Sequence, residues 1–244
     1  VIKVSVIIPT YNYGKYICDA IDSVLKQTYE DYEIIVVDDG SKDETSNILK
    51  KYDDKIAYYY IENQGPAAAR NFGIKKANGK YISFLDADDA FLPEKLEIQV
   101  NILEKQKDVG LVYSDFLYVN NTLASVYYKF KCKNTSSHIE ALQYLWHNNY
   151  INTSTVITVK DYLFEVGLFN ENFRYAEDYD LWLRLGKNYK FYCIHQPLVK
   201  TRSHSKNHCK KIDDLEKINY TKIVRKNIKE FYKKEKGKYQ LNII

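Results

Sequence analysis

A dense group of carboxylates follows a short apolar segment near residue 85. The segment 81–85, Tyr-Ile-Ser-Phe-Leu, has the composition of a buried strand and follows an Asn-Gly turn signal. Asp86, Asp88 and Asp89 come directly after it. Like charges this close repel, so one carboxyl takes up a proton unless a cation lies between them. A hard divalent ion, Mg²⁺ or Mn²⁺, is the natural occupant, and such ions often hold phosphate groups. The cluster therefore indicates chemistry on a nucleotide or a phosphate ester.

Two earlier apolar segments also end in polar clusters. Val4–Ile8 is followed by Pro9–Asn12, and Glu33–Val37 is followed by Asp38-Asp39. Ligands bind at the carboxyl ends of strands in open parallel sheets, so the shared position indicates one ligand site. The two carboxylates suit hydrogen bonds from a base or a ribose, although turn chemistry before a glycine gives the same pattern.

A basic residue near the start of a predicted helix is a candidate phosphate ligand. The helix is expected over Pro66–Ala77, begins with small residues and carries Arg70. A helix N-terminus favours phosphate, and the planar guanidinium can clamp a pyrophosphate. The alternative is an exposed arginine on an ordinary helix.

Two further groups in the second half suggest chemistry. Glu177-Asp178 opens a predicted, partly buried helix that carries Trp182. A carboxylate there is a candidate general base, whereas helix capping alone would also favour acids at this point. His204 is a candidate Mn²⁺ ligand beside carboxylates, although a lone loop histidine is more often solvated or structural.

The elements that must position these groups alternate along the first half of the chain. Strands are expected at 4–8, 33–37, 56–61, 81–85 and 109–113, and helices at 16–27, 41–52 and 66–77. The helix over 41–52 is expected to begin with a capping box of Ser41 and Glu44. This alternation predicts an α/β fold with a Rossmann-like, mostly parallel sheet flanked by helices.

Composition and charge narrow the class of protein. The 244 residues are 45% hydrophobic, enough for one sizeable domain, and no stretch has the length of a membrane span. The four cysteines are scattered, which favours a reducing cytoplasm over a disulfide framework. The net charge is +4, but residues 201–244 carry 13 basic and 5 acidic side chains.

The basic C-terminal segment has three interpretations. Asp213–Lys238 has the pattern of a basic amphipathic helix. Such a helix can lie on an anionic membrane surface, pack on the core as a solvated helix, or form a contact in a homodimer. No nucleic-acid-binding motif accompanies the charge, so nucleic acid is not an expected partner.

Five motifs occur in order along the chain and resemble a known family. They are Val4–Asn12, Val37–Ser41, Ala69-Arg70-Asn71, Asp86-Ala87-Asp88 and Glu177-Asp178. Together they are similar to the motifs of the family 2 nucleotide-sugar glycosyltransferases of GT-A fold, over roughly residues 2–204. The Gln-x-x-Arg-Trp motif of processive synthases is not evident, which argues for transfer of one or a few sugars.

The resemblance implies a role for each motif. The donor-binding residues would be Pro9, Thr10, Tyr11 and Asn12 at the nucleoside, Asp39 at the base, Arg70 at the nucleotide or its phosphates, and Asp86 and Ala87 of the DXD motif. Asp88 would be the direct ligand of Mn²⁺ or Mg²⁺, and His204 would complete the metal site. Asp178 would be the catalytic base. The acceptor side would include Glu177, Trp182 and Gly167.

The expected function is therefore inverting transfer of a hexose or N-acetylhexosamine. The donor would be a nucleoside-diphosphate sugar, usually a uridine one, and the acceptor a hydroxyl of a glycan, a lipid-linked molecule or a protein. Residues 1–204 would form the catalytic domain, with a nucleotide-binding half (1–113) and an acceptor-side half (114–204), and 205–244 a helical extension. The protein would be cytoplasmic, at the inner face of the membrane if the basic segment binds lipid.

Two other classes stay open at this point. One is a non-catalytic nucleotide-sugar-binding protein, which would bind donor and turn nothing over. The other is an aspartyl-phosphate phosphatase built on Asp86 and Asp88, which would leave Asp38-Asp39 and Glu177-Asp178 without a use.

Overall fold

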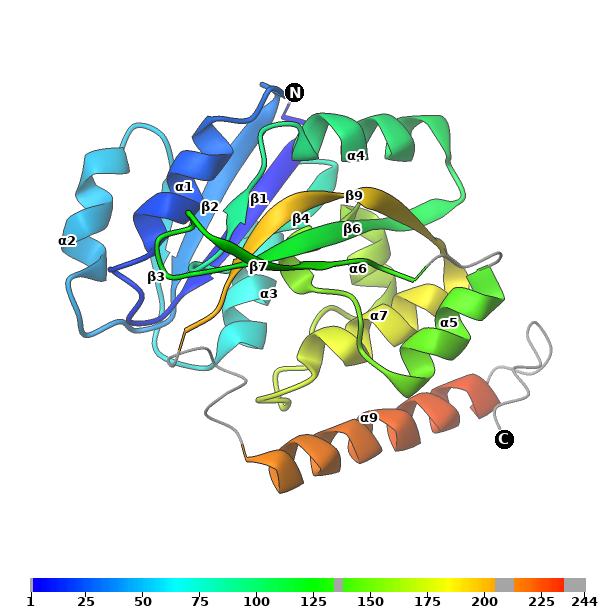
Figure 1. The fold of residues 1–244 in the computed structure, drawn as a ribbon. Coiled ribbons are helices and arrows are strands. Elements are labelled where there is room, and N and C mark those ends of the chain that lie inside the picture. The colour runs from blue at the N-terminus through cyan, green and yellow to red at the C-terminus, as the bar shows by residue number, and fades with distance from the viewer. Residues whose placement is uncertain (1, 134–137, 205–212, 235–244) are drawn as a thin grey trace.

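The protein folds around one twisted sheet with helices on both faces (Figure 1). The structure is a computed structural model that describes residues 2–133, 138–204 and 213–234. The strand order is β3-β2-β1-β4-β8-β6-β9-β5, and β7 pairs with β6. The predicted α/β fold is confirmed.

The first half of the sheet is parallel and follows the sequence pattern closely. Its elements are β1 (Val4–Thr10), α1 (Ile17–Leu25), β2 (Tyr32–Asp38), α2 (Thr45–Leu49), the 3-10 turn η1 (Lys50–Tyr52), β3 (Ala57–Tyr60), α3 (Pro66–Lys76) and β4 (Tyr81–Phe84). Strand β1 pairs in parallel with β2 and with β4, and β2 pairs in parallel with β3. Thr10 lies opposite Asp38, so the polar groups that follow β1 and β2 emerge at the same edge of the sheet.

The second half mixes strand directions. Its elements are β5 (Ala90–Phe91), α4 (Lys95–Lys105), β6 (Val109–Val119), β7 (Val126–Phe130), α5 (His138–His147), the 3-10 turn η2 (Thr153–Thr155), β8 (Ile157–Val159), α6 (Lys160–Val166), α7 (Glu177–Asn188), β9 (Lys190–Arg202) and α9 (Asp214–Lys234). Strand β8 is antiparallel to both β4 and β6, whereas the long β9 runs parallel to β6. The strand predicted over 109–113 continues to Val119.

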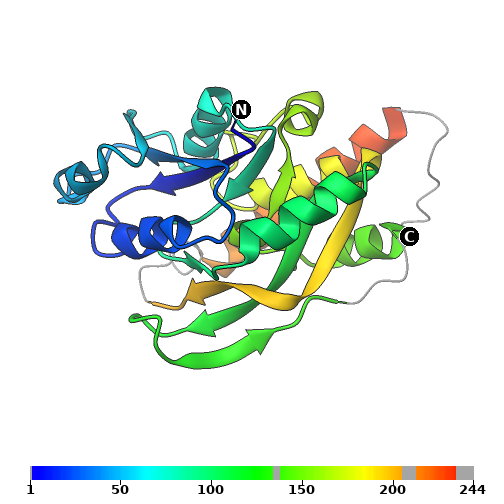
Figure 2. The same cartoon turned by 90° about the horizontal axis from the view of Figure 1, so that it is seen from above.

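Alternation along the central strands divides the core into two clusters. Successive strand side chains point to opposite faces. In β1, Val6 and Ile8 join the cluster under α1 and α4, whereas Ile7 joins the cluster under α3, α5 and α7. Figure 1 shows α4 above the sheet and α7 below it, and Figure 2 shows α4 crossing in front of the sheet.

The predicted helix start at Ser41 is wrong. Helix α2 begins four residues later, at Thr45, and Glu44 precedes it without a side-chain cap. The Ser41 hydroxyl instead accepts a hydrogen bond from the backbone N–H of Asn12, 2.8 Å away. A capping box needs the serine side chain to face its own helix, and here it ties two strand-end loops together.

The C-terminal helix α9 packs on the core. Its Val224 and Ile228 are buried in the core, and its Arg225 guanidinium donates to the carbonyl of His147 over 2.6 Å. The opposite side exposes Leu215 and Ile218. The predicted helix is thus confirmed over Asp214–Lys234, and its predicted end lies outside the described residues. Among the helices the structure describes, none is long and apolar enough to span a membrane.

Candidate active site

The two acids after β2 organise the loops around them. Each Asp38 oxygen accepts a hydrogen bond, one from the N–H of Ser41 and one from the hydroxyl of Tyr58. Asp39 accepts backbone N–H groups of Gln64 and Gly65, both over 2.8 Å. Burial raises the pKa of the Asp39 carboxyl, although the two backbone donors oppose the shift. The pair therefore shapes the loop that leads into α3.

The residues after β1 line the same edge of the sheet. Asn12 takes a left-handed conformation, with φ 56°, and its side chain accepts the N–H of Lys42. Tyr11 is exposed, and Pro9 is half-buried. Thr10 is buried, and its hydroxyl has no hydrogen-bond partner among the described residues. A buried hydroxyl of this kind carries a desolvation penalty that a bound polar group would relieve.

Arg70 connects the DXD segment to the acidic pair on α7. One terminal nitrogen donates to Asp86 over 2.8 Å, and the other donates to Glu177 over 2.7 Å. The arginine is 5% exposed and lies over the ring of Phe169. Burial opposes its charge, but the two carboxylates outweigh burial and raise the pKa of Arg70. The reading of Arg70 as an exposed helix residue is wrong.

His204 lies directly against the DXD motif. Its Nε2 is 2.9 Å from Oδ2 of Asp88, and the ring stacks on Tyr16 with centroids 4.8 Å apart. The structure thus brings together the two residues that the sequence assigned to a metal. Asp86 and Ala87 directly precede Asp88 in the chain, and Ala87 is buried.

The donor set at Asp88 and His204 fits a divalent ion that also binds phosphate. Neighbouring ligands at about 2.1 Å from an octahedral ion lie about 3.0 Å apart, close to the separation of these two atoms. Mg²⁺ is usually held by few protein ligands and completes its coordination with substrate phosphates and water. One carboxylate and one imidazole suit that pattern.

Asp89 is a structural member of the cluster. Its two carboxylate oxygens accept hydrogen bonds from the Ser154 hydroxyl and from the backbone N–H of Arg202. Burial, followed by the charges of Asp88 and Asp86, raises its pKa well above the ordinary value. Asp89 thereby ties the DXD segment to the end of β9.

A turn that sequence reasoning missed links both halves of the site. In η2, the hydroxyl of Thr153 donates to Asp178 over 2.9 Å. The next residue, Ser154, donates to Asp89 and accepts the N–H of Asp86. A run of small polar residues at 152–155 was the available signal, but it does not reveal such distant partners.

The predicted base, Asp178, lies half-buried in the first turn of α7. Its oxygens accept hydrogen bonds from Thr153, from the amide of Asn149 over 3.1 Å and from the N–H of Tyr179. Burial raises its pKa to about 6, with a further increase from Glu177 that Arg70 partly offsets. A carboxyl with this pKa is largely ionised at neutral pH and still basic enough to accept a proton.

The three predicted acceptor-side residues lie in different environments. Trp182 is fully buried between Phe84 and Phe169, so it supports the site from inside the core and offers no surface to an acceptor. That placement corrects the prediction. Glu177 is buried against Arg70. Gly167, with φ 92°, ends α6 and lines a cavity of about 540 Å³ between α3, α7 and α9.

Fold and site together define a GT-A domain whose polar loop residues gather at the carboxyl edge of the parallel strands. The family model described as glycosyl transferase family 2 matches residues 5–165, and the chain belongs to this family. An uncharacterized glycosyltransferase of Rickettsia typhi is 40% identical over 82% of this chain and 64% of its own length.

A relative that is named for a specific activity comes from Escherichia coli. It is the UDP-Glc:alpha-D-GlcNAc-diphosphoundecaprenol beta-1,3-glucosyltransferase WfgD, 35% identical over 76% of this chain and 70% of its own length. The chain spans just under two thirds of the length of the rickettsial relative, so that protein carries residues beyond the region aligned here.

Solved structures share the fold at low sequence identity. Staphylococcus aureus TarS in complex with UDP-GlcNAc matches with a TM-score of 0.71 and 22% identity, over 91% of this chain and 66% of that one. The mannosyltransferase PcManGT of Pyrobaculum calidifontis, in complex with GDP-Man and Mn²⁺, matches with a TM-score of 0.64 and 20% identity, over 84% of this chain and 58% of that one.

Proposed function

We propose that this protein transfers a hexose or N-acetylhexosamine from a nucleoside-diphosphate sugar to an acceptor hydroxyl, with inversion at the anomeric carbon. The observation that carries the proposal is the link Asp86–Arg70–Glu177, which joins the diphosphate end of the site to the segment that holds Asp178. A group that binds the leaving diphosphate and a group that accepts the proton are thereby held in one site.

The donor would lie along the carboxyl edge of the parallel strands. Thr10, Tyr11 and Asn12 would line the nucleoside pocket, and Asp39 would hold the loop beside the base. We favour a uridine nucleotide, since WfgD is named for UDP-Glc and TarS was solved with UDP-GlcNAc. The guanidinium of Arg70 already binds two carboxylates, so we assign it to positioning Asp86 and Glu177 rather than to a free phosphate clamp.

Asp88 and His204 would hold Mn²⁺ or Mg²⁺, which when bound supplies positive charge beside the departing nucleoside diphosphate. A Mn²⁺ ion accompanies GDP-Man in PcManGT, which supports this assignment. Asp89 and Ser154 would keep the loop in place before and after the ion binds.

Asp178 would act on the acceptor. A lone pair of the acceptor hydroxyl attacks the anomeric carbon, the bond from that carbon to the phosphate oxygen breaks, and the hydroxyl proton passes to a carboxylate oxygen of Asp178. Thr153 and Asn149 would orient the carboxylate for that transfer. Fixing two bound substrates in line supplies much of the rate enhancement.

We further propose a lipid-linked glycan as acceptor, approached from a membrane surface. The named acceptor of WfgD is a diphosphoundecaprenol-linked sugar. The outer side of α9 exposes Leu215, Ile218 and Ile223 together with Lys222 and Lys226, a combination that suits an anionic lipid surface. Co-flotation with anionic but not with zwitterionic vesicles would support this contact, and equal recovery with both would reject it.

The test of the function is a panel of donors. Release of nucleoside diphosphate is measured from UDP-Glc, UDP-GlcNAc, GDP-Man and TDP-Glc, with Mn²⁺ and with EDTA, with and without a polyprenyl-diphosphate-linked sugar. We expect metal-dependent release from one donor that the acceptor accelerates. Donor binding without turnover for every acceptor would instead indicate a non-catalytic binding protein. No binding and no release would reject both readings.

A further inference from the structure

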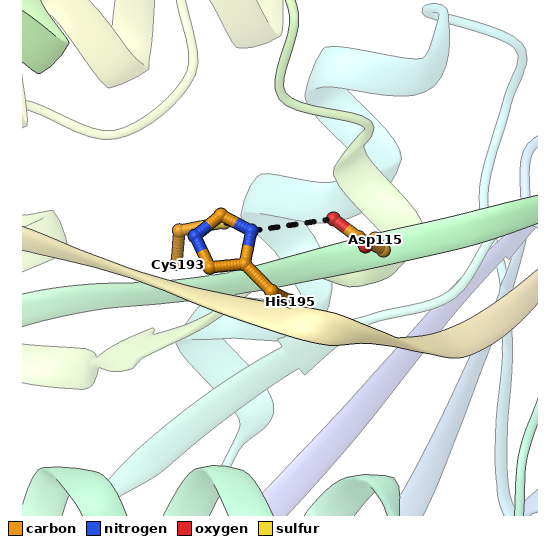
Figure 3. Close-up of side chains that lie close together, drawn as sticks. All are labelled: Asp115, Cys193 and His195. Atoms are coloured by element: carbon orange, nitrogen blue, oxygen red, sulfur yellow. Dashed lines mark hydrogen bonds and ion pairs between the residues drawn. The ribbon is translucent and has the colours of Figure 1, made fainter. Parts of the chain in front are cut away.

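A second cluster of metal-binding side chains lies on the sheet, outside the proposed donor site. Asp115 comes from β6, and Cys193 and His195 come from β9 (Figure 3). One ligand atom from each lies within 4.8 Å of the others. Figure 3 shows the three side chains turned toward one another over the two strands. None of them is used in the proposed transfer reaction.

The parallel pairing of β6 with β9 builds this cluster, beside an irregularity in the register. Ser114 pairs with Ile194, but the next residue of β6, Asp115, pairs with Pro197. His195 therefore falls in a bulge of β9. Bulges redirect side chains, and proline within a sheet is tolerated at such points. Cys193 pairs with Tyr113, and alternation puts His195 on the face of Cys193 and Asp115 on the face of Tyr113. The three side chains therefore share one face of the sheet.

The distances are close to those of a tetrahedral zinc site. His195 Nδ1 is 3.9 Å from Asp115 Oδ1 and 3.8 Å from Cys193 Sγ. Around zinc, with Zn–N near 2.1 Å and Zn–S near 2.3 Å, the matching separations are about 3.4 Å and about 3.5 Å. Cys193 Sγ and the Asp115 oxygen lie no more than 4.8 Å apart, so side-chain movements of about 1 Å would bring the three atoms onto one ion.

A fourth ligand is within reach. Cys132, just after β7, donates its backbone N–H to Asp115 Oδ1 over 2.8 Å. The Cys132 thiol is buried and donates to the backbone carbonyl of Ser114 over 3.2 Å, so it would turn away from that carbonyl to bind the ion. Cys132 and Cys193 are both free thiols.

The surroundings suit a metal that binds thiolates. A pocket of about 350 Å³, lined by Lys129, Lys131, Cys132 and His195 among others, opens beside the cluster and gives an ion a way in. Two thiolates and one carboxylate around Zn²⁺ carry one net negative charge, which the two lysine ammonium groups would offset. Asp115 is only 2% exposed, and a buried carboxylate favours a nearby cation.

We propose that Asp115, Cys132, Cys193 and His195 bind a zinc ion that fastens the bulge of β9 to β6. Mixed sulfur and nitrogen ligands in tetrahedral arrangement select zinc over the hard ions that bind carboxylates and phosphates. Each thiol would release its proton to solvent as the ion binds. Because β9 leads on to Arg202, which holds Asp89 and the carbonyl of Asp88, the ion would also steady the donor site.

The test uses the full chain, purified under reducing conditions, loaded with Zn²⁺ and passed through a desalting column. We expect about one zinc ion per chain to remain, and cobalt loading to produce a thiolate-to-cobalt charge-transfer band. Cys193→Ser should weaken the band, because only the Cys132 thiolate would remain, and should lower zinc affinity by more than about 100-fold, the upper range for loss of an outer hydrogen-bond partner.

Two matched variants locate the ion. Cys18→Ser removes a half-buried thiol on α1 and should leave zinc binding unchanged. Asp88→Asn alters the donor-site ligand and should also leave it unchanged, which separates this inference from the proposed function. Circular dichroism of Cys193→Ser checks that the fold persists.

Several outcomes would overturn the proposal. They are a wild-type protein that retains no zinc, cobalt bound without a charge-transfer band, or zinc retained equally by Cys193→Ser. A His195 that only pairs with Asp115 would give the first of these results.

Discussion

Removing the charge of Arg70 should destabilise the protein far more than removing an exposed lysine of a similar ion pair. Arg70 is buried, and its partners Asp86 and Glu177 have side chains 37% and 11% exposed. Breaking a buried ion pair costs about 3–5 kcal/mol because a charge stays behind without a partner. Asp86 is partly exposed, so water can solvate its carboxylate once the arginine is gone. We therefore expect Arg70→Ala to lower the free energy of unfolding by about 3 kcal/mol, the lower end of that range.

The assay is urea unfolding followed by tryptophan fluorescence and circular dichroism. The control is Lys190→Ala, which removes the cation from an ion pair with Asp108 in which both side chains are mostly exposed. Water screens such a pair, so the control should unfold close to the wild type. If Arg70→Ala unfolds at the same urea concentration as the control, the bridge does not stabilise the fold and the reasoning is refuted.

A second readout separates positioning from stability. Glu177→Gln keeps the shape of the side chain and weakens only its charge contact with Arg70. If Glu177 positions the neighbouring Asp178, kcat should fall while the KM for donor stays near the wild-type value. A rise in KM with unchanged kcat would show that the residue serves donor binding instead.

Four further predictions concern the base and the packing of the sheet. Asp178→Asn should bind donor with unchanged affinity by calorimetry and lose about 10²–10⁴-fold in kcat, the usual contribution of a general base; turnover near the wild-type rate would remove Asp178 from that role. Wild-type kcat/KM should rise with pH through about 6, because the base must lose its proton to work. Thr153→Val removes a hydrogen bond that favours the ionised Asp178 carboxylate, so the rise of kcat/KM should move to higher pH. A rise at the wild-type pH would show that another group controls it. Gly79→Ala would place a Cβ 2.6 Å from the backbone nitrogen of Ser5, and thermal denaturation should show a loss of about 1–3 kcal/mol, whereas an unchanged midpoint would contradict so close an approach.

Local patterns predicted much of the first half of the chain. Strands β1, β2 and β4 are short apolar runs, each buried on both faces. A strand buried on both faces is apolar at nearly every position, so it can be recognised from composition alone. The second half was harder to predict. Strand β9 contains a proline, lysines and a bulge, which interrupt the alternation of apolar and polar residues. Strands β5 and β8 are two and three residues long, too short to show such an alternation.

The motifs located the site, but their partners had to come from the fold. The chain position of Asp88 predicted a role at a metal, and His204 does lie against it, 116 residues further on. The same kind of reasoning put Trp182 on the acceptor side and Ser41 at a helix start, and both were wrong. The spacing of apolar residues and the composition indicate whether a side chain is buried. They do not indicate which distant group it contacts.

By itself, the sequence determined the α/β class, the carboxyl-edge location of the acids and the family of the chain, since these depend on local burial patterns and short motifs. Tertiary structure alone decided that Arg70 joins two carboxylates, one of them 107 residues away, and that Thr153 reaches Asp178. It also decided that the pairing of β6 with β9 gathers Asp115, Cys193 and His195. The reason is physical: a buried charge or thiol is stabilised by whatever group the packed chain brings within a few ångströms, and that choice is made by long-range packing.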